Sequence, residues 1–103
     1  MSDKVPDPLS PDEAKRKIDL FLDQGRFRVS AHCRDESMPK RNVTSPDIVN
    51  CLKTGSVIRP PQWDDRFQNW KYEVEGIDLD DEILRAITVI FDQNLTLLVL
   101  TVF

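Results

Sequence analysis

The sequence lacks any long apolar run. Its 103 residues contain no stretch of about 18 apolar residues, the length that a membrane-spanning helix needs. The opening segment MSDKVPDPLSPDE also lacks the apolar core of a secretory signal. We therefore predict a protein that does not cross a membrane and stays in the cytoplasm, where thiols remain reduced.

Histidine and cysteine are scarce as well. The chain holds one histidine, His32, and two cysteines, Cys33 and Cys51, with no Cys-x-x-Cys pair. A structural zinc site takes four such ligands, and only three are present. We expect no metal site and no cofactor, and we interpret both cysteines as small apolar residues near helices.

Several enzyme motifs are missing. There is no Gly-rich phosphate loop, no Gly-x-Ser-x-Gly and no helix with paired histidines. The acidic stretch 78–82 lacks the spacing and the central glycine of a calcium loop, so we interpret it as a solvated turn.

A basic segment is present in an otherwise acidic chain. The whole sequence has a net charge of −4, with 14 Lys and Arg against 18 Asp and Glu. Residues 26–60 hold seven basic and three acidic side chains, a local charge of +4, and the remainder carries −8. A basic segment in an acidic domain indicates a face for an anionic partner.

The N-terminal half has the pattern of helices. Residues 1–9 are polar and contain two prolines, so we predict a flexible tail before a single domain over residues 10–103. The residues Ser10-Pro11-Asp12-Glu13 form a helix start, and Gly25 is a typical helix end. Between them an apolar stripe at helical spacing predicts an amphipathic helix over 11–24; its members are Ala14, Ile18, Phe21 and Leu22.

Two shorter helices are expected next. After an extended link at 26–30, Ser30 caps a helix over about 31–38 that Pro39 ends, because the residue before a proline avoids helical angles. A further helix begins at Thr44-Ser45-Pro46-Asp47 and ends at Gly55. Its buried side is predicted to be Ile48, Val49, Cys51 and Leu52.

From residue 56 onward the apolar period changes to two. We predict a short strand at 57–58, a polar loop at 62–68, a half-exposed strand at 70–74 and two apolar strands at 82–92 and 95–103. Helices followed by strands predict an α+β fold. In it the N-terminal helices pack on one face of a three- to four-stranded antiparallel sheet.

Few side chains could carry chemistry. An imidazole titrates near neutral pH, so His32 could act as acid or base, or it could be a structural group at a helix start. Arg34, Lys40 and Arg41 could hold a phosphodiester, or they could form a solvated rim that pairs with neighbouring carboxylates.

Arg85 and the aromatic residues are further candidates. Arg85 lies in a strongly apolar strand, where an unpaired charge is costly. It is either at the exposed strand start or projects into an anion site on the sheet. Trp63, Trp70 and Tyr72 could stack on unpaired bases, or serve as core or rim aromatics.

The order of residues from about 26 to 103 resembles a known pattern. It includes Ser30-Ala31-His32, Met38, Arg41, Val43, Asp47-Ile48, Leu52, Gly55-Ser56-Val57, Tyr72 and Thr101-Val102-Phe103. This layout resembles a family of small bacterial domains of unknown function that reads S-x-H-A-x-x-R-M-x-x-R-G-I-S-x-x-D-I, then L-x-x-G-x-V. Here the spacing from His32 to Arg41 is one residue longer than in that pattern.

The resemblance implies a fold and an activity. The family is similar to the RelE and BrnT toxins of the barnase-like fold and, more distantly, to MqsR toxins. It implies a RelE/BrnT-like fold, an RNA substrate and a cognate antitoxin. The implied active surface contains His32, Arg41 and Tyr72.

We therefore expect a toxin-like endoribonuclease of the mRNA interferase type that needs no metal ion. The ribose 2′-hydroxyl would attack the adjacent phosphate, with His32 or Tyr72 handling the proton. Arg34, Arg41 and Arg85 would stabilise the developing negative charge. The predicted substrate-binding residues are Arg34, Lys40, Arg85 and Trp70.

The alternative is a non-catalytic module that binds protein or RNA and kept only the fold. The acidic net charge favours it, because affinity for nucleic acid depends on phosphate neutralisation. The longer spacing between His32 and Arg41 favours it too. The sequence leaves the choice between enzyme and module open, and it does not indicate the oligomeric state.

Overall fold

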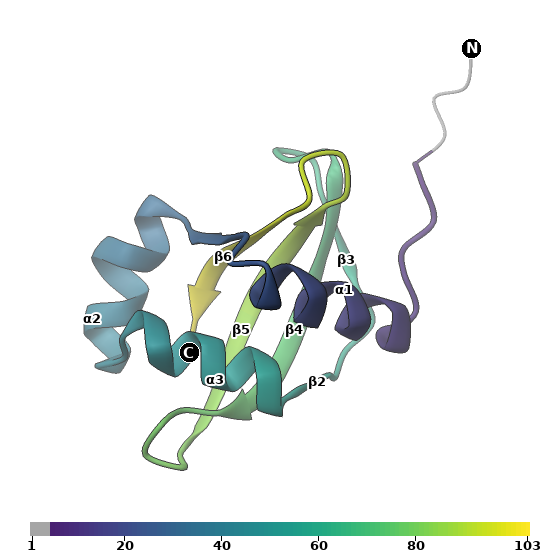
Figure 1. Ribbon diagram of the computed structural model, residues 1–103. Helices are drawn as coiled ribbons and strands as arrows, with labels where there is room; N and C mark the ends of the chain where they lie inside the picture. The colour runs from purple at the N-terminus through teal and green to yellow at the C-terminus, as the bar shows by residue number, and fades with distance from the viewer. Residues whose placement is uncertain (1–4) are drawn as a thin grey trace.

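The computed structural model describes residues 5–103 (Figure 1). Within this range the chain forms three α-helices, one π-helical turn and six strands of one sheet. The helical elements are α1 (Pro11–Asp23), η1 (Cys33–Ser37), α2 (Met38–Arg41) and α3 (Ser45–Thr54). The strands are β1 (Phe27–Val29), β2 (Ser56–Val57), β3 (Gln62–Asp64), β4 (Asn69–Ile77), β5 (Ile83–Phe91) and β6 (Thr96–Val102). The α+β class is as predicted.

Helix α1 forms where its caps and its stripe predict it. The Glu13 N–H donates to Ser10 Oγ at 3.2 Å, and the Ser10 N–H donates to the Glu13 carboxylate at 3.1 Å, a reciprocal pair that starts the helix. At the other end Gly25 has φ +68°, a backbone angle that suits glycine. The predicted apolar stripe is buried: Ala14, Ile18, Phe21 and Leu22.

The sheet is mixed, whereas the sequence predicted three or four antiparallel strands. The strand order is β1-β6-β5-β4-β2, with β3 also paired to β4. All pairs are antiparallel except β1 and β6, which run parallel with Phe27 opposite Leu97. The predicted link at 26–30 therefore contains strand β1, and the predicted polar loop at 62–68 contains strand β3.

The helical segment after β1 passes through Pro39, which was predicted to end it. The Met38 N–H donates to the carbonyl of Cys33, five residues back, so η1 is a π-helical turn and α2 starts directly after it. Pro39 then lies in the first turn of α2, where a missing N–H costs little. The segment ends at Asn42, which is left-handed at φ 59°.

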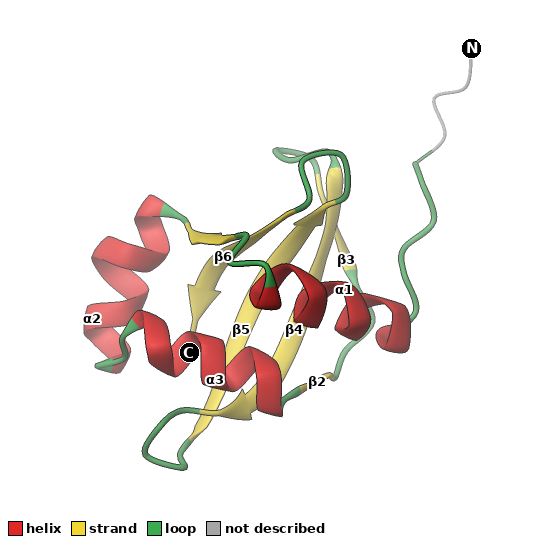
Figure 2. Ribbon diagram, in the orientation of Figure 1, coloured by secondary structure: helices red, strands yellow, loops and turns green. Residues whose placement is uncertain are grey.

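Helices α1 and α3 cover one face of the sheet, and the core lies between them (Figure 2). Ile18 from α1, Leu52 from α3 and Leu84 from β5 are fully buried there. The end of α3 approaches β4 so closely that a Cβ on Gly76 would overlap the carbonyl of Cys51. Within residues 5–103 the other face of the sheet carries no helix across it, and we call it the open face.

None of the helices in the described part of the chain is long and apolar enough to cross a membrane. The tail predicted for residues 1–9 lies partly outside the described range, at residues 1–4. Residues 5–9 form no helix or strand, but two hydrogen bonds attach them to β4.

Candidate functional site

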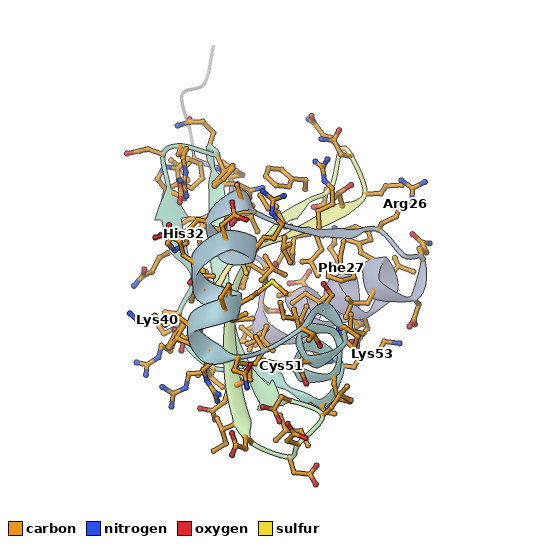
Figure 3. The ribbon with its side chains drawn as sticks, turned by 90° about the vertical axis from the view of Figure 1, so that its left-hand side faces the viewer. Arg26, Phe27, His32, Lys40, Cys51 and Lys53 are labelled. Atoms are coloured by element: carbon orange, nitrogen blue, oxygen red, sulfur yellow. The ribbon has the colours of Figure 1, made fainter. Side chains whose placement is uncertain are left out.

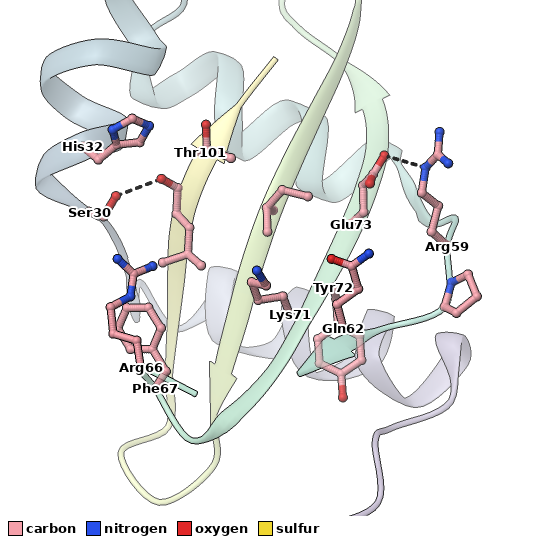
Figure 4. Close-up of a pocket in the computed structure, with 13 residues that line it drawn as sticks. Ser30, His32, Arg59, Gln62, Arg66, Phe67, Lys71, Tyr72, Glu73 and Thr101 are labelled. Carbon is pink, nitrogen blue, oxygen red and sulfur yellow. Dashed lines mark hydrogen bonds and ion pairs between the residues drawn. The ribbon is translucent and has the colours of Figure 1, made fainter. Parts of the chain in front are cut away.

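The open face of the sheet contains a hollow of about 380 Å³, which we call the central hollow (Figure 4). Strands β4, β5 and β6 form its floor, and Ser30 and His32 stand at one side. The segment before β3 bounds the opposite side, and the turn between β3 and β4 brings Arg66 and Phe67 to the rim. Its size is in the range of small-ligand sites.

A row of residues in register crosses the floor. Glu73 on β4 pairs with Ile87 on β5, and Ile87 pairs with Thr101 on β6. Arg59 stands beyond Glu73, and His32 stands beyond Thr101. Alternation along β4 explains the placement, because the side chains of Lys71 and Glu73 face the hollow while that of Tyr72, between them, lies in the core.

The charges of the central hollow are arranged in pairs. Arg59 Nε lies 3.1 Å from the carboxylate of Glu73, whose side chain is only 13% exposed. Arg66 and Lys71 lie 3.7 and 3.6 Å from the carboxylate of Asp64, just outside the lining. Partial burial would raise the pKa of Asp64, but the N–H groups of Phe67 and Arg66 and the two nearby cations outweigh it and lower that pKa. Both carboxylates thus hold cations at the hollow.

His32 is positioned by the start of the helical segment. Ser30 Oγ accepts the Cys33 N–H at 3.0 Å and donates to the Leu100 carbonyl at 2.9 Å, which ties this start to β6. The imidazole Nδ1 lies 2.8 Å from the Glu36 carboxylate, and the side chain is 61% exposed. A proton on Nδ1 that is donated to Glu36 leaves Nε2 available to a ligand.

A second hollow of about 500 Å³ adjoins the first, and we call it the side hollow. It is lined by His32, Glu36, Ser37, Lys40, Arg41, Thr101, Val102 and Phe103. His32 and Thr101 line both hollows, so the two meet at these residues. Arg41 is partly committed elsewhere, since its Nη2 donates to the Ile83 carbonyl at 2.6 Å.

The π-helical turn accounts for the unusual spacing between His32 and Arg41. In a regular α-helix, residues nine apart differ by about 900° and lie on opposite sides. The π-helical turn absorbs one residue, which leaves a relation close to that of residues eight apart, about 80°. Both side chains consequently line the side hollow despite the longer spacing. Figure 3 shows His32 near one end of this helical segment and Lys40 near the other.

Tyr72 was predicted at the active surface, but its hydroxyl points away from the central hollow (Figure 4). The residue is 3% exposed and shares the core-facing side of β4 with Val74. Its hydroxyl accepts the Leu9 N–H at 2.8 Å, and burial raises the pKa of the phenol. This placement does not bring the hydroxyl to His32.

Three predicted substrate-binding residues lie outside both hollows. Arg34 is exposed and pairs with Asp35 at 2.9 Å. Arg85 is on the open face, where it pairs with Glu75 at 2.8 Å across strands β4 and β5. Trp70 donates its indole N–H to the Pro6 carbonyl at 2.7 Å and packs edge-on against Trp63. Of the predicted residues, His32 and Tyr72 line the central hollow, and His32, Lys40 and Arg41 line the side hollow.

Four charged residues of the central hollow were missed at the sequence level. Lys71 and Glu73 could have been found from alternation along β4, because the polar residues there occupy every second position. Arg59 and Arg66 carry no such signal, since they lie in irregular segments that the tertiary fold brings to the rim.

Both cysteines are buried and free, as expected of core residues. Burial raises the pKa of Cys33, and it raises the pKa of Cys51 to about 11, so both thiols stay protonated at neutral pH. Among residues 5–103 no three side chains of His, Cys, Asp or Glu are grouped as a metal ion would need.

Comparison with known proteins gives one result for this chain. No curated protein and no solved structure matches it. A family model described as "Domain of unknown function (DUF4258)" matches residues 29–103. This range begins within β1 and contains every residue that lines the two hollows, whereas α1 precedes it. The chain therefore belongs to the DUF4258 family.

Proposed function

We propose that the central hollow binds a phosphodiester of RNA and cleaves it, as a toxin-like endoribonuclease that needs no metal ion. One observation supports this most strongly. The hollow is lined by an imidazole, a carboxylate, two guanidinium groups and an ammonium group: His32, Glu73, Arg59, Arg66 and Lys71. Such a set can move protons and stabilise negative charge on phosphorus.

The proposed mechanism assigns one proton transfer to each end of the floor. Glu73 takes the proton of the ribose 2′-hydroxyl, and the resulting oxygen attacks the adjacent phosphorus. Protonated His32 gives its proton to the departing 5′-oxygen. Arg59, Arg66 and Lys71 stabilise the charge on the pentacoordinate phosphorus. The products are a 2′,3′-cyclic phosphate and a free 5′-hydroxyl.

The resemblance to RelE and BrnT toxins supports this choice of reaction and extends it to a partner. We include in the proposal a cognate antitoxin that occupies the open face. A protein that presents carboxylates to Arg59 and Arg66 would replace their present partners, Glu73 and Asp64. It would thereby compete with RNA for the central hollow.

A second candidate is an RNA-binding module without activity. It is favoured by the ion pair of Glu73, because a carboxylate that lies 3.1 Å from Arg59 Nε is less available to take a proton. Arg59, Arg66 and Lys71 each have a carboxylate within 4 Å that a phosphate must displace, and this weakens RNA binding in both candidates. The net charge of −4 weakens it further.

The test is cleavage of a labelled RNA oligonucleotide by the purified full chain in the presence of EDTA. Mass spectrometry would identify the cyclic phosphate on the product. His32→Ala and Glu73→Gln are each expected to lower the rate by about 10²–10⁴. The matched control is Arg16→Ala, which removes a charge from the exposed side of α1 and is expected to leave the rate unchanged.

The outcomes separate the two candidates. Binding of RNA that Arg66→Ala weakens, without any cleavage by the wild-type protein, would replace the enzyme with the binding module. If the wild-type protein neither cleaves nor binds RNA, both candidate functions are excluded. Cleavage that EDTA abolishes would exclude the proposed mechanism.

A further inference from the structure

The side hollow adjoins the central hollow, so one ligand can occupy both. The two share His32 and Thr101, so a molecule that passes the imidazole leaves one hollow and enters the other. Their volumes are about 380 and 500 Å³, and each alone has the size of a small-ligand site. Two such hollows in contact suit an elongated ligand better than a compact one.

The groups in the side hollow suit a nucleotide. Lys40 is exposed and has no ion-pair partner among the described residues, so its ammonium group can meet a phosphate without displacing a carboxylate. Phe103 lines the same hollow and is 49% exposed, which leaves an aromatic ring for a base to stack on. Among the side chains that line this hollow only that of Glu36 carries a negative charge, and it is engaged with His32 at 2.8 Å.

The π-helical turn makes this arrangement possible. Without this turn the same residues would form a regular α-helix, and Arg41 would lie on the side opposite His32. With it, the cationic end of the segment and the imidazole face one surface. π-Helical turns of this kind occur frequently at functional sites.

We propose that the two hollows form one continuous track for a single strand of RNA, and that Lys40 and Phe103 bind the nucleotide next to the one held at the central hollow. This inference rests on the proposed binding of RNA at the central hollow. It adds that the ligand is an oligonucleotide, which needs at least two adjacent phosphates to reach full affinity.

The experiment measures binding of fluorescent 2′-O-methyl RNA, which lacks the attacking hydroxyl and cannot be cleaved by the proposed route. A dinucleotide and a hexanucleotide are compared by fluorescence anisotropy at several salt concentrations. Lys40→Ala is expected to weaken hexanucleotide binding on the order of fivefold and to lower the salt slope by about 0.7. Phe103→Ala is expected to weaken it by at least about fivefold.

Matched controls keep the result specific. Arg16→Ala removes a charge from the exposed side of α1 outside both hollows, and it is expected to leave both affinities unchanged. Lys40 and Phe103 are exposed, and circular dichroism would establish that each variant is folded.

Two results would overturn the track. One is a hexanucleotide affinity that Lys40→Ala and Phe103→Ala leave unchanged while Arg66→Ala weakens it. The other is equal affinity for the two lengths of RNA. Failure of the enzymatic proposal is distinguishable, because length-dependent binding that these variants weaken would persist in a wild-type protein that does not cleave RNA.

Discussion

The helix-covered face and the open face of the sheet are made by alternate residues of the same strands. On β5, Leu84 is fully buried beneath the helices, whereas its neighbour Arg85 pairs with Glu75 on the open face. On β4, Tyr72 is buried while Lys71 and Glu73 line the central hollow. The contrast indicates that the helix-covered face supplies stability and that the open face carries the charged groups.

The largest expected effect is on the helix-covered face. Leu84→Ala removes a fully buried side chain from the central strand and leaves a cavity. We expect it to lower the free energy of unfolding by about 2–5 kcal/mol, measured by urea denaturation. A loss of unfolding free energy below about 1 kcal/mol would contradict the view that the helix-covered face supplies the stability.

Tyr72→Phe is expected to have a smaller effect on stability than Leu84→Ala. It tests the division between the faces on β4, whose side chains alternate between them. The ring stays in the core, but the Leu9 N–H loses its acceptor. We expect a loss of about 0.5–1.5 kcal/mol in unfolding free energy and no change in RNA cleavage. If cleavage falls as far as in His32→Ala, the hydroxyl takes part in the reaction and our placement of it outside the site is wrong.

Asp47, at the start of α3, makes the stability of the helix-covered side depend on pH. The N–H groups of Thr44 and Leu79 hold the pKa of this carboxyl below its ordinary value of 3.8. A lowered folded-state pKa stabilises the protein above the unfolded-state pKa, and this stability is lost as the pH falls through the folded-state pKa.

Asp47→Asn is therefore expected to be less stable than the wild-type protein at neutral pH, and the difference is expected to shrink below pH 3.8. Thermal unfolding followed across this pH range measures it. A difference that is constant with pH would show that the charge of Asp47 is not the cause.

The smallest effect is expected at Arg85, the neighbour of Leu84 in sequence. Its ion pair with Glu75 is partly exposed to solvent, so Arg85→Gln should cost only about 0.2–1 kcal/mol of unfolding free energy. RNA affinity should change less than about twofold, because the residue lines neither hollow. Glu75→Gln is the matched control, and a large loss of RNA affinity in Arg85→Gln alone would restore Arg85 as a binding residue.

Local signals predicted the elements that local interactions determine. The start of α1 follows from the reciprocal bonds of Ser10 and Glu13, and strands β5 and β6 follow from long runs of branched apolar residues. Neither strand β1 nor its pairing with β6 could be predicted. Three residues are too few to show an alternating apolar pattern, and β6 lies about 70 residues further along the chain. Pro39 misled the prediction because a π-helical turn directly before it places the proline in a first turn.

The sequence predicted the part of the candidate site that a single helical segment supplies. His32, Lys40 and Arg41 come from a single helical segment, so their sequence neighbourhood indicated a shared surface. Arg59 and Arg66 reach the central hollow through the course of the chain around β3, which sequence spacing does not encode. Tyr72 was assigned to the site from resemblance; it lines the central hollow, but alternation along β4 places its side chain in the core.

The parallel pairing of β1 with β6 has a consequence for synthesis on the ribosome. Ser30 bonds to Leu100, 70 residues later, so the position of the imidazole beside the sheet depends on a strand that is translated after every other helix and strand within residues 5–103. Contacts of such long range close late in folding. A nascent chain that ends before β6 has its helices and all 14 Lys and Arg residues but no assembled hollow. Whatever chemistry the hollow performs starts only after the strand at residues 96–102 has left the exit tunnel.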